Sequence, residues 1–215
     1  SHHFDKLNWW LNSKATEVTA TGGLKCFGVN ASPFHGENCR TCPHTAECRF
    51  AVAPEYYRDY ELFYKYASPD SYKPDLCVFS PKIDIEDFLS AGIRFENGVY
   101  VNYTLSAHCN FEGEDIFFEG DLGRIEMRRR KGYGTPEKSS VLLYRFGTAE
   151  PENIELKLEA GTHGGADSRL YEDLFGDADS GRLATLEDGI QAVLTGVAVN
   201  ESIRTGGKID VQSLL

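Results

Sequence analysis

The feature that most constrains the fold of this 215-residue chain is a change in the spacing of its apolar residues. From about 76 to 160 they alternate with polar residues, and a period of two is typical of half-buried strands. Asn97-Gly98 lies between two such runs, and an Asn-Gly pair in that place predicts a β-hairpin. Short turns between consecutive strands predict a mostly antiparallel sheet. We expect its further strands at 114–120, 123–130, 139–146 and 153–159.

Both ends of the chain show helical spacing instead. Gly206-Gly207 marks the end of the last helix. Helices, then a run of strands, then helices predict an α+β fold with one large open, mostly antiparallel sheet and helices on one face. No linker or repeat interrupts this order, so we expect a single domain, 1–215. We expect helices at 3–12, 56–67, 169–175 and 186–203, and a strand at 16–28.

The charge balance is acidic, with 22 Lys and Arg against 33 Asp and Glu and a net charge of −11. A duplex-binding domain normally has a basic surface, so we expect no nucleic-acid partner. The one basic run, 128–131, is interpreted as a solvated strand end rather than a phosphate-binding patch. No apolar stretch approaches the roughly 20 residues that cross a membrane. No secretory signal opens the sequence, so we expect a cytoplasmic protein without a membrane partner.

Four of the six cysteines fall in or beside an irregular insert at about 29–54. The insert has few apolar residues, so a bound metal would supply its folding free energy. A C-x2-C turn brings two thiolates to one ion, and structural zinc prefers four such ligands in a tetrahedron. The sequence therefore predicts a structural zinc, with His35 or His44 as a substitute fourth ligand. The predicted zinc ligands are Cys26, Cys39, Cys42 and Cys48.

Three other interpretations of these cysteines stay open: free thiols in a reducing compartment, disulfides, and an iron–sulfur cluster. Cys77 and Cys109 lie in strand-like runs, and for them we expect a place in the core.

Two histidine–aspartate pairs are candidates for chemistry. His2 and Asp5 lie three residues apart, which places them on one face of a helical turn, and histidine can act as a general base near neutral pH. The alternative is a purely structural role, in which these residues cap the start of the helix. His163 and Asp167 flank the glycine pair of the turn 161–167, between a strand and a helix. Such a turn exposes backbone N–H groups that attract anions and hydroxyl oxygens, although a purely structural turn is the alternative.

Taken in order, these pieces resemble the C-terminal domain of the glucose–fructose oxidoreductase / inositol dehydrogenase family (Gfo/Idh/MocA), over nearly the whole chain. The start SHHFDKLNWWL is similar to the family's H-x-x-D helix, and NCRTCPHTAEC to an insert found in a cysteine-bearing subset. The end is the most specific part: THGGADSRLYEDLF, followed by RLATLEDGIQAVLTGVAVNESIRTGGKIDV.

This resemblance implies the substrate-binding half of an NAD(P)-dependent oxidoreductase that acts on a CH–OH group of a sugar, cyclitol or related polyol. NAD or NADP would be bound by an N-terminal Rossmann domain of the same polypeptide, so we expect the 215 residues alone to be inactive. The family's catalytic histidine carries over to His2. Asp5 would orient the substrate, and His163 and Asp167 match the family's H-G-G-x-D turn beside it.

Two other functions are weighed against this one. The first is an NAD-using glycosidase of the same family, which would release sugar without net change in nicotinamide absorbance. The second is a non-enzymatic binding or scaffold domain. In every case an open sheet needs its outer face covered, so we expect a homodimer or homotetramer through the sheet.

Overall fold

The computed structural model describes residues 1–53, 55, 61–66, 73–132, 135–156, 162–176, 181 and 183–215. They form two compact units. The first contains Ser1–His108 and Asp188–Leu215, and the second contains Cys109–Glu187. The α+β class and the antiparallel pairing are confirmed. The strands, however, are divided between two four-stranded sheets, where the sequence predicted one. The prediction of a single domain stays a prediction.

The first unit is built on a sheet with the strand order β3-β2-β1-β8. Each pairing is antiparallel, and Val18 of β1 lies between Ile93 of β2 and Ile209 of β8. Along β2 every second side chain is buried, which gives this sheet one apolar and one solvated face. The strands are β1 (Ala15–Gly23), β2 (Phe88–Phe95), β3 (Tyr100–Ser106) and β8 (Ile209–Asp210).

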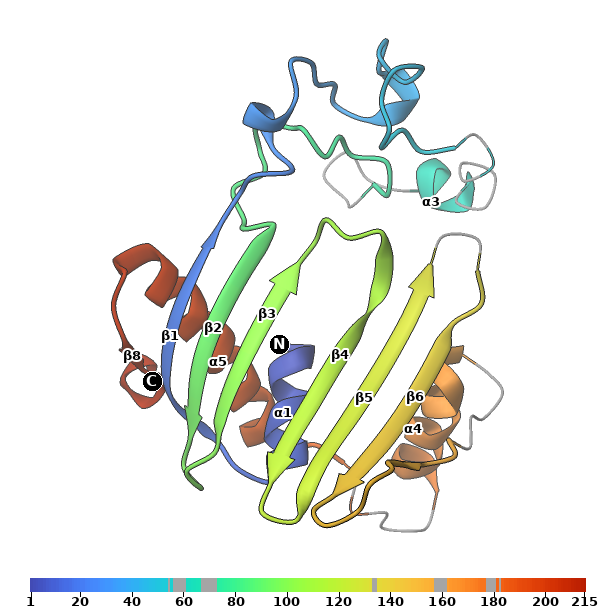
Figure 1. Ribbon diagram of the computed structural model, residues 1–215. Helices are drawn as coiled ribbons and strands as arrows, with labels where there is room; N and C mark the ends of the chain where they lie inside the picture. The colour runs from blue at the N-terminus through green and yellow to red at the C-terminus, as the bar shows by residue number, and fades with distance from the viewer. Residues whose placement is uncertain are drawn as a thin grey trace. The chain divides into compact units, whose positions relative to one another are not determined.

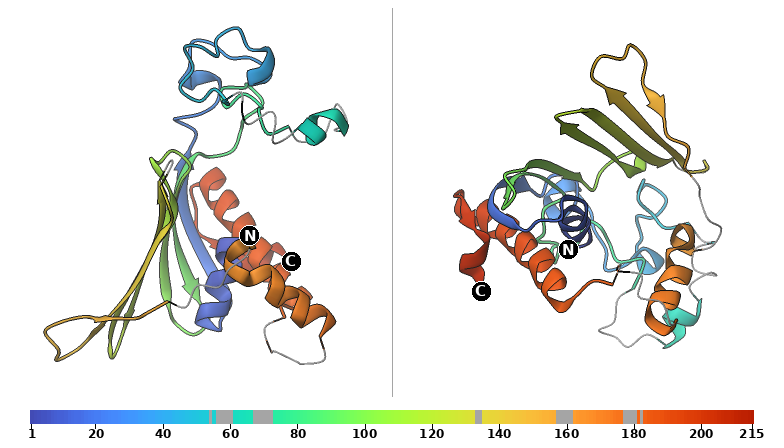
Figure 2. Two further views of the ribbon diagram at one scale, coloured as in Figure 1. Left: turned by 90° about the vertical axis from the view of Figure 1, so that its right-hand side faces the viewer. Right: turned by 90° about the horizontal axis from the view of Figure 1, so that it is seen from below.

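Two helices, α1 (His2–Leu11) and α5 (Leu186–Thr205), cover the apolar face of this sheet (Figures 1 and 2). Phe4 of α1 and Val199 of α5 belong to the buried cluster that also contains the inward side chains of β1 and β2. Ser202, at the end of α5, is fully buried; its hydroxyl accepts from the backbone N–H of Ala20 and donates to the carbonyl of Gly207. The first of these hydrogen bonds ties α5 to β1, and the second holds the turn that follows α5.

The predicted hairpin at Asn97-Gly98 joins β2 to β3. Gly98 has φ +86°, a left-handed conformation that glycine adopts without steric cost. The Asn97 side chain has a further role, since its amide donates to the carbonyl of Leu11 at the end of α1 at 3.1 Å. The hairpin turn therefore also determines where the first helix ends.

A long insert, residues 24–87, connects β1 to β2, and its described part contains only short helices. They are η1 (Val29–Ala31), η2 (Cys39–Thr41) and α3 (Glu61–Tyr66). The predicted strand 16–28 ends at Gly23 because the backbone N–H groups of residues 25–27 turn towards the carboxylate of Asp87. The alternating pattern expected from about 76 gives a strand only from Phe88 onward. Of the predicted helix 56–67, residues 56–60 and 67 lie outside the described residues.

The second unit holds a sheet with the order β4-β5-β6-β7, all pairs antiparallel. The predicted strands 114–120, 123–130 and 139–146 are confirmed with small shifts of their ends. The last prediction, 153–159, is wrong over residues 154–156, because the strand ends at Asn153, and residues 157–159 lie outside the described residues. A short turn, η3 (Thr162–Gly165), leads into α4 (Ala166–Phe175). The strands are β4 (Phe111–Gly120), β5 (Gly123–Gly132), β6 (Lys138–Arg145) and β7 (Glu152–Asn153); η4 (Val211–Leu214) closes the chain in the first unit.

The two faces of the β4–β6 sheet differ in chemistry. Directly opposed residues share a face, so the register groups six apolar side chains on one of them, named here the apolar face. One ion pair, Arg129 with Glu114, lies on the same face beyond these residues. The other face carries Phe117 and three arginines that pair with acidic side chains: Arg124, Arg128 and Arg130. No side chain in the described part of Cys109–Glu187 is buried in the core. The apolar face consists of Ile116, Phe118, Ile125, Met127, Val141 and Leu143.

Candidate functional site

The first turn of α1 carries the H-x-x-D pair. His2 is exposed and Asp5 half-buried, and the backbone N–H of Asp5 donates to the carbonyl of Ser1 at 2.9 Å. Between them Phe4 is buried and its ring lies 5.2 Å from that of Tyr103. Burial of Phe4 therefore fixes the turn to the sheet while leaving the His2 imidazole accessible.

The neighbouring His3 makes a contact that the sequence did not reveal. Its Nδ1 lies 2.6 Å from the hydroxyl of Tyr103 on β3, with a ring separation of 5.7 Å. Burial raises the pKa of Tyr103, so its hydroxyl keeps its proton. The two residues are separated by a hundred positions, and sequence spacing gave no signal for their pairing.

In the second unit, the glycine turn holds His163 and Asp167 together. Nδ1 of His163 lies 3.0 Å from each carboxylate oxygen of Asp167. His163 has φ +50°, which is rare for a residue with a Cβ, and Gly164 and Gly165 continue the left-handed path at +64° and +83°. Such a conformation costs about 1–3 kcal/mol and is typical of binding and catalytic sites. The His163 side chain is 80% exposed, so it is presented to solvent.

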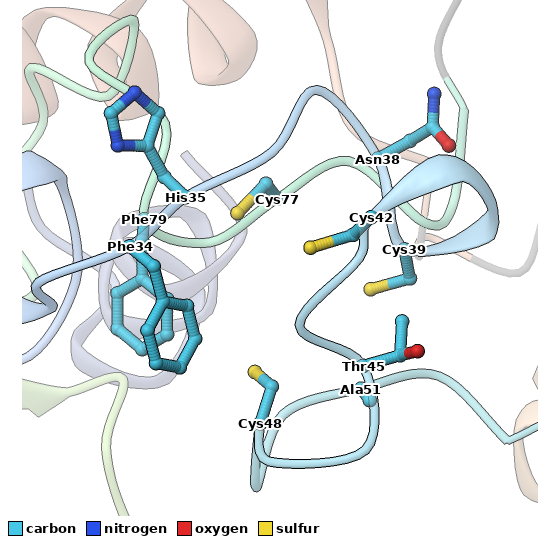
Figure 3. Close-up of a pocket in the computed structure, with 10 residues that line it drawn as sticks. All are labelled: Phe34, His35, Asn38, Cys39, Cys42, Thr45, Cys48, Ala51, Cys77 and Phe79. Atoms are coloured by element: carbon cyan, nitrogen blue, oxygen red, sulfur yellow. The ribbon is translucent and has the colours of Figure 1, made fainter.

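The insert brings four thiols to one small cavity of about 20 Å³. Cys39, Cys42 and Cys48 lie in the first half of the insert. Cys77 lies in its return segment, residues 73–87, which leads to β2. Their sulfur atoms face a common space, with Phe34 and Phe79 beside it (Figure 3). The ring of His35 points away from the sulfur atoms in the same view, and His44 stacks on Phe34 with ring centres 4.5 Å apart.

The Cys39 thiol is the one whose acidity its surroundings change. Burial raises its pKa, and the carboxylate of Asp75 and the neighbouring thiols of Cys48 and Cys77 raise it further. A hydrogen bond from the backbone N–H of Val52 acts in the opposite direction but is outweighed. In the absence of a cation, the Cys39 sulfur is therefore a thiol at neutral pH.

Two of the sequence expectations about cysteines need revision. Cys26 is half-buried and does not line the thiol cavity; its backbone N–H instead donates to Asp87. Cys109 is exposed, between β3 and β4, and Cys77 lies before β2 in the insert, so their expected place in a strand core is wrong. As the side chains are placed, the described residues contain no group of three His, Cys, Asp or Glu side chains that could hold a metal ion.

The basic run on β5 is neutralised by its neighbours. Arg128 pairs with Glu126 at 3.0 Å, Arg129 with Glu137 at 3.2 Å, and Arg130 with Asp115. Of these pairs, the one between Arg130 and Asp115 joins two strands. Exposed ion pairs of this kind are typical of a solvated strand, as the sequence predicted. In the part of the chain that the structure describes, no helix has both the length and the apolar composition for crossing a membrane.

These features define an α+β domain with an accessible H-x-x-D turn and a strained histidine–aspartate turn. The family model described as "Oxidoreductase family, C-terminal alpha/beta domain" matches residues 1–211. The chain therefore belongs to the Gfo/Idh/MocA oxidoreductase family, of which it is a C-terminal domain.

Relatives agree with this assignment. The "Putative oxidoreductase YteT" of Bacillus subtilis (strain 168) is 30% identical over 224 residues, covering 94% of this chain and 51% of its own length. The structure of the aldose-aldose oxidoreductase from Caulobacter crescentus, complexed with glycerol, has a TM-score of 0.55 at 13% identity, over 97% of this chain and 45% of that one. The structure of a putative NADPH-dependent oxidoreductase from Desulfitobacterium hafniense DCB-2 has a TM-score of 0.56 at 10% identity, over 100% of this chain and 47% of that one. The chain thus spans about half the length of these relatives.

Proposed function

We propose that this chain is the substrate-binding and assembly part of an NAD(P)-dependent oxidoreductase that acts on a CH–OH group of a sugar, cyclitol or related polyol. The observation that carries the proposal is the strained turn in which Asp167 holds the imidazole of His163 towards solvent. Family membership supports the redox class, and the H-x-x-D turn supplies a second histidine suited to proton transfer.

His2 acts on the proton of the reacting hydroxyl. Its exposed imidazole accepts this proton as the substrate is oxidised, and returns it in the reverse direction. Asp5, half-buried one turn further, orients the substrate. In the second unit, His163 is suited to binding hydroxyl groups, because Asp167 fixes its ring through Nδ1 and leaves Nε2 available. A nicotinamide cofactor, held by an N-terminal domain of the same polypeptide, supplies or accepts the hydride.

The test is steady-state kinetics of the complete polypeptide on a panel of polyols, followed by nicotinamide absorbance. We expect His2→Ala to lower kcat by about 10²–10⁴-fold, the usual contribution of a general base. Asp167→Asn should mainly raise KM. Glu172→Gln, an exposed change on the same helix as Asp167, is the matched control and should leave both constants unchanged. Equal rates in His2→Ala and the unmodified enzyme would refute the assignment of the base, and sugar release without net absorbance change would instead identify the glycosidase.

We further propose that a second copy of the chain covers the apolar face of the β4–β6 sheet. Its six apolar side chains lie together, and Ile125 at its centre is 37% exposed. Phe117, on the opposite face, is 45% exposed but lies under the guanidinium groups of Arg124 and Arg128. We therefore expect Ile125→Lys to shift the protein towards monomer in sedimentation experiments and Phe117→Lys to leave the assembly intact. A wild-type monomer at micromolar concentration would refute this interface.

A cytoplasmic location remains a prediction.

A further inference from the structure

The thiol cavity of the insert joins two chain segments that are distant in sequence. Cys39 begins the short helix η2, and its N–H donates to the carbonyl of Asp75 at 2.8 Å. The N–H of Cys77 donates to the carbonyl of Glu37 at 3.1 Å, and Asn38 forms an isolated antiparallel bridge with the residue before Cys77. These two backbone hydrogen bonds make up the bridge, and they bring Cys77 beside the C-x2-C turn.

The local turn also orients the other sulfur atoms. The N–H of Cys42 donates to the carbonyl of Cys39 at 3.2 Å, which closes the C-x2-C turn. The N–H of His44 donates to the sulfur of Cys42 at 3.4 Å. The N–H of Cys48 donates to the carbonyl of His44 at 3.1 Å and closes the following turn. Hydrogen bonds from backbone N–H groups to sulfur are the outer contacts that hold thiolate ligands of a metal in position.

The insert has little else to hold it. Among the residues of the insert whose side chains are described, 24–53, 55, 61, 62, 64–66 and 73–87, Phe79 is the single buried hydrophobic one. It packs against Phe50, with ring centres 5.7 Å apart, and lines the thiol cavity on its other side. A segment of this length without a larger core normally depends on a cross-link, and a structural metal contributes its binding free energy directly to folding.

We propose that Cys39, Cys42, Cys48 and Cys77 together bind one structural zinc ion, with Cys77 taking the place that sequence spacing assigned to Cys26. Four thiolates are a common ligand set of structural zinc, and these four sulfur atoms line one small cavity. The thiols reach the ion by side-chain rotation around the cavity, with loss of their protons to solvent. The ion fastens the C-x2-C turn to the return segment of the insert.

The first test needs no variant. The protein that carries these residues is purified without chelator, its metal content is measured, and its thiols are alkylated under native conditions before peptide mass spectrometry. We expect about one zinc per chain, protection of the four ligand thiols, and modification of Cys26 and Cys109. Treatment with a chelator should open all six thiols to the reagent, and Co²⁺ added afterwards should give the visible spectrum of a tetrahedral thiolate site.

The second test compares Cys77→Ser with Cys26→Ser as its matched control. We expect Cys77→Ser to lose at least half of the zinc and Cys26→Ser to retain all of it. Zinc loss confined to Cys26→Ser would overturn the proposal in favour of the set predicted from spacing. Iron with acid-labile sulfide, a native disulfide among the four, or metal-free protein with all four thiols reactive would each overturn it as well.

Discussion

Asp87 closes the base of the insert, and its replacement should loosen the insert. The side chain is 4% exposed and accepts from three successive backbone N–H groups: Lys25 at 3.0 Å, Cys26, and Phe27 at 2.8 Å. Its own N–H donates to the carbonyl of Gly23 at 3.0 Å. One carboxylate therefore satisfies the donors of a turn that leaves β1, from a position one residue before β2.

The size of the effect follows from these contacts. A hydrogen bond to a charged group contributes about 1.5–3 kcal/mol, and a buried donor left without a partner costs about 1–3 kcal/mol. Because water can reach part of this turn, we expect Asp87→Ala to lower the free energy of unfolding by about 3–5 kcal/mol rather than by the full sum. Asp87→Asn keeps one acceptor oxygen and should cost about 1–2 kcal/mol. Urea unfolding measures both, with exposed Asp84→Asn as the control.

The same site predicts a dependence on pH. Burial opposes ionisation of Asp87, but the N–H donors of residues 25–27 and 87 outweigh it, so its pKa lies below the ordinary 3.8. A carboxylate with a lowered pKa contributes stability that is complete above its unfolded pKa and is lost as the pH falls through the folded pKa. Wild type should thus lose stability below about pH 4, and Asp87→Asn should lose less. An Asp87→Ala change under 1 kcal/mol would refute the reasoning.

Two further predictions concern the core of the first unit. The His3–Tyr103 hydrogen bond should give a coupling of about 0.5–1.5 kcal/mol in a double-mutant cycle of His3→Ala and Tyr103→Phe; additive changes in unfolding free energy would exclude it. A Cβ on Gly22 would lie 2.9 Å from Cβ of Leu89, whereas one on Gly92 has its nearest neighbour at 3.9 Å. Gly22→Ala should therefore destabilise by about 1–3 kcal/mol and Gly92→Ala much less; equal melting temperatures would contradict the packing.

Residue patterns within a few positions predicted most helices, strands and turns, because these elements are determined by neighbouring residues. The left-handed Gly98 turn and the glycine that ends α5, Gly206 at φ +70°, are both set by residues within a few positions. The division into two sheets was not predictable in this way. Alternation shows that 100–106 and 111–120 are strands, but not whether they pair with one another.

Contacts between distant residues escaped the sequence for a related reason. C-x2-C spacing indicates that Cys39 and Cys42 converge, but the position of Cys77 depends on backbone pairing across the insert. Spacing therefore favoured Cys26, which follows β1 and does not line the thiol cavity; its backbone N–H donates to Asp87. The tie between His3 and Tyr103 likewise depends on packing of α1 against β3.

The closed base of the insert has a consequence for how this fold can vary among relatives. Gly23 and Phe88 are paired partners on antiparallel neighbours, so the ends of the intervening segment meet where an ordinary tight turn would suffice. Lengthening a loop closed at such a point costs only about 0.6 kcal/mol per doubling of its length. A change in the length of the insert therefore leaves the register of the β1–β2 ladder unaffected. The contacts that hold the insert together must therefore come from its own residues, such as the packing of Phe79 on Phe50.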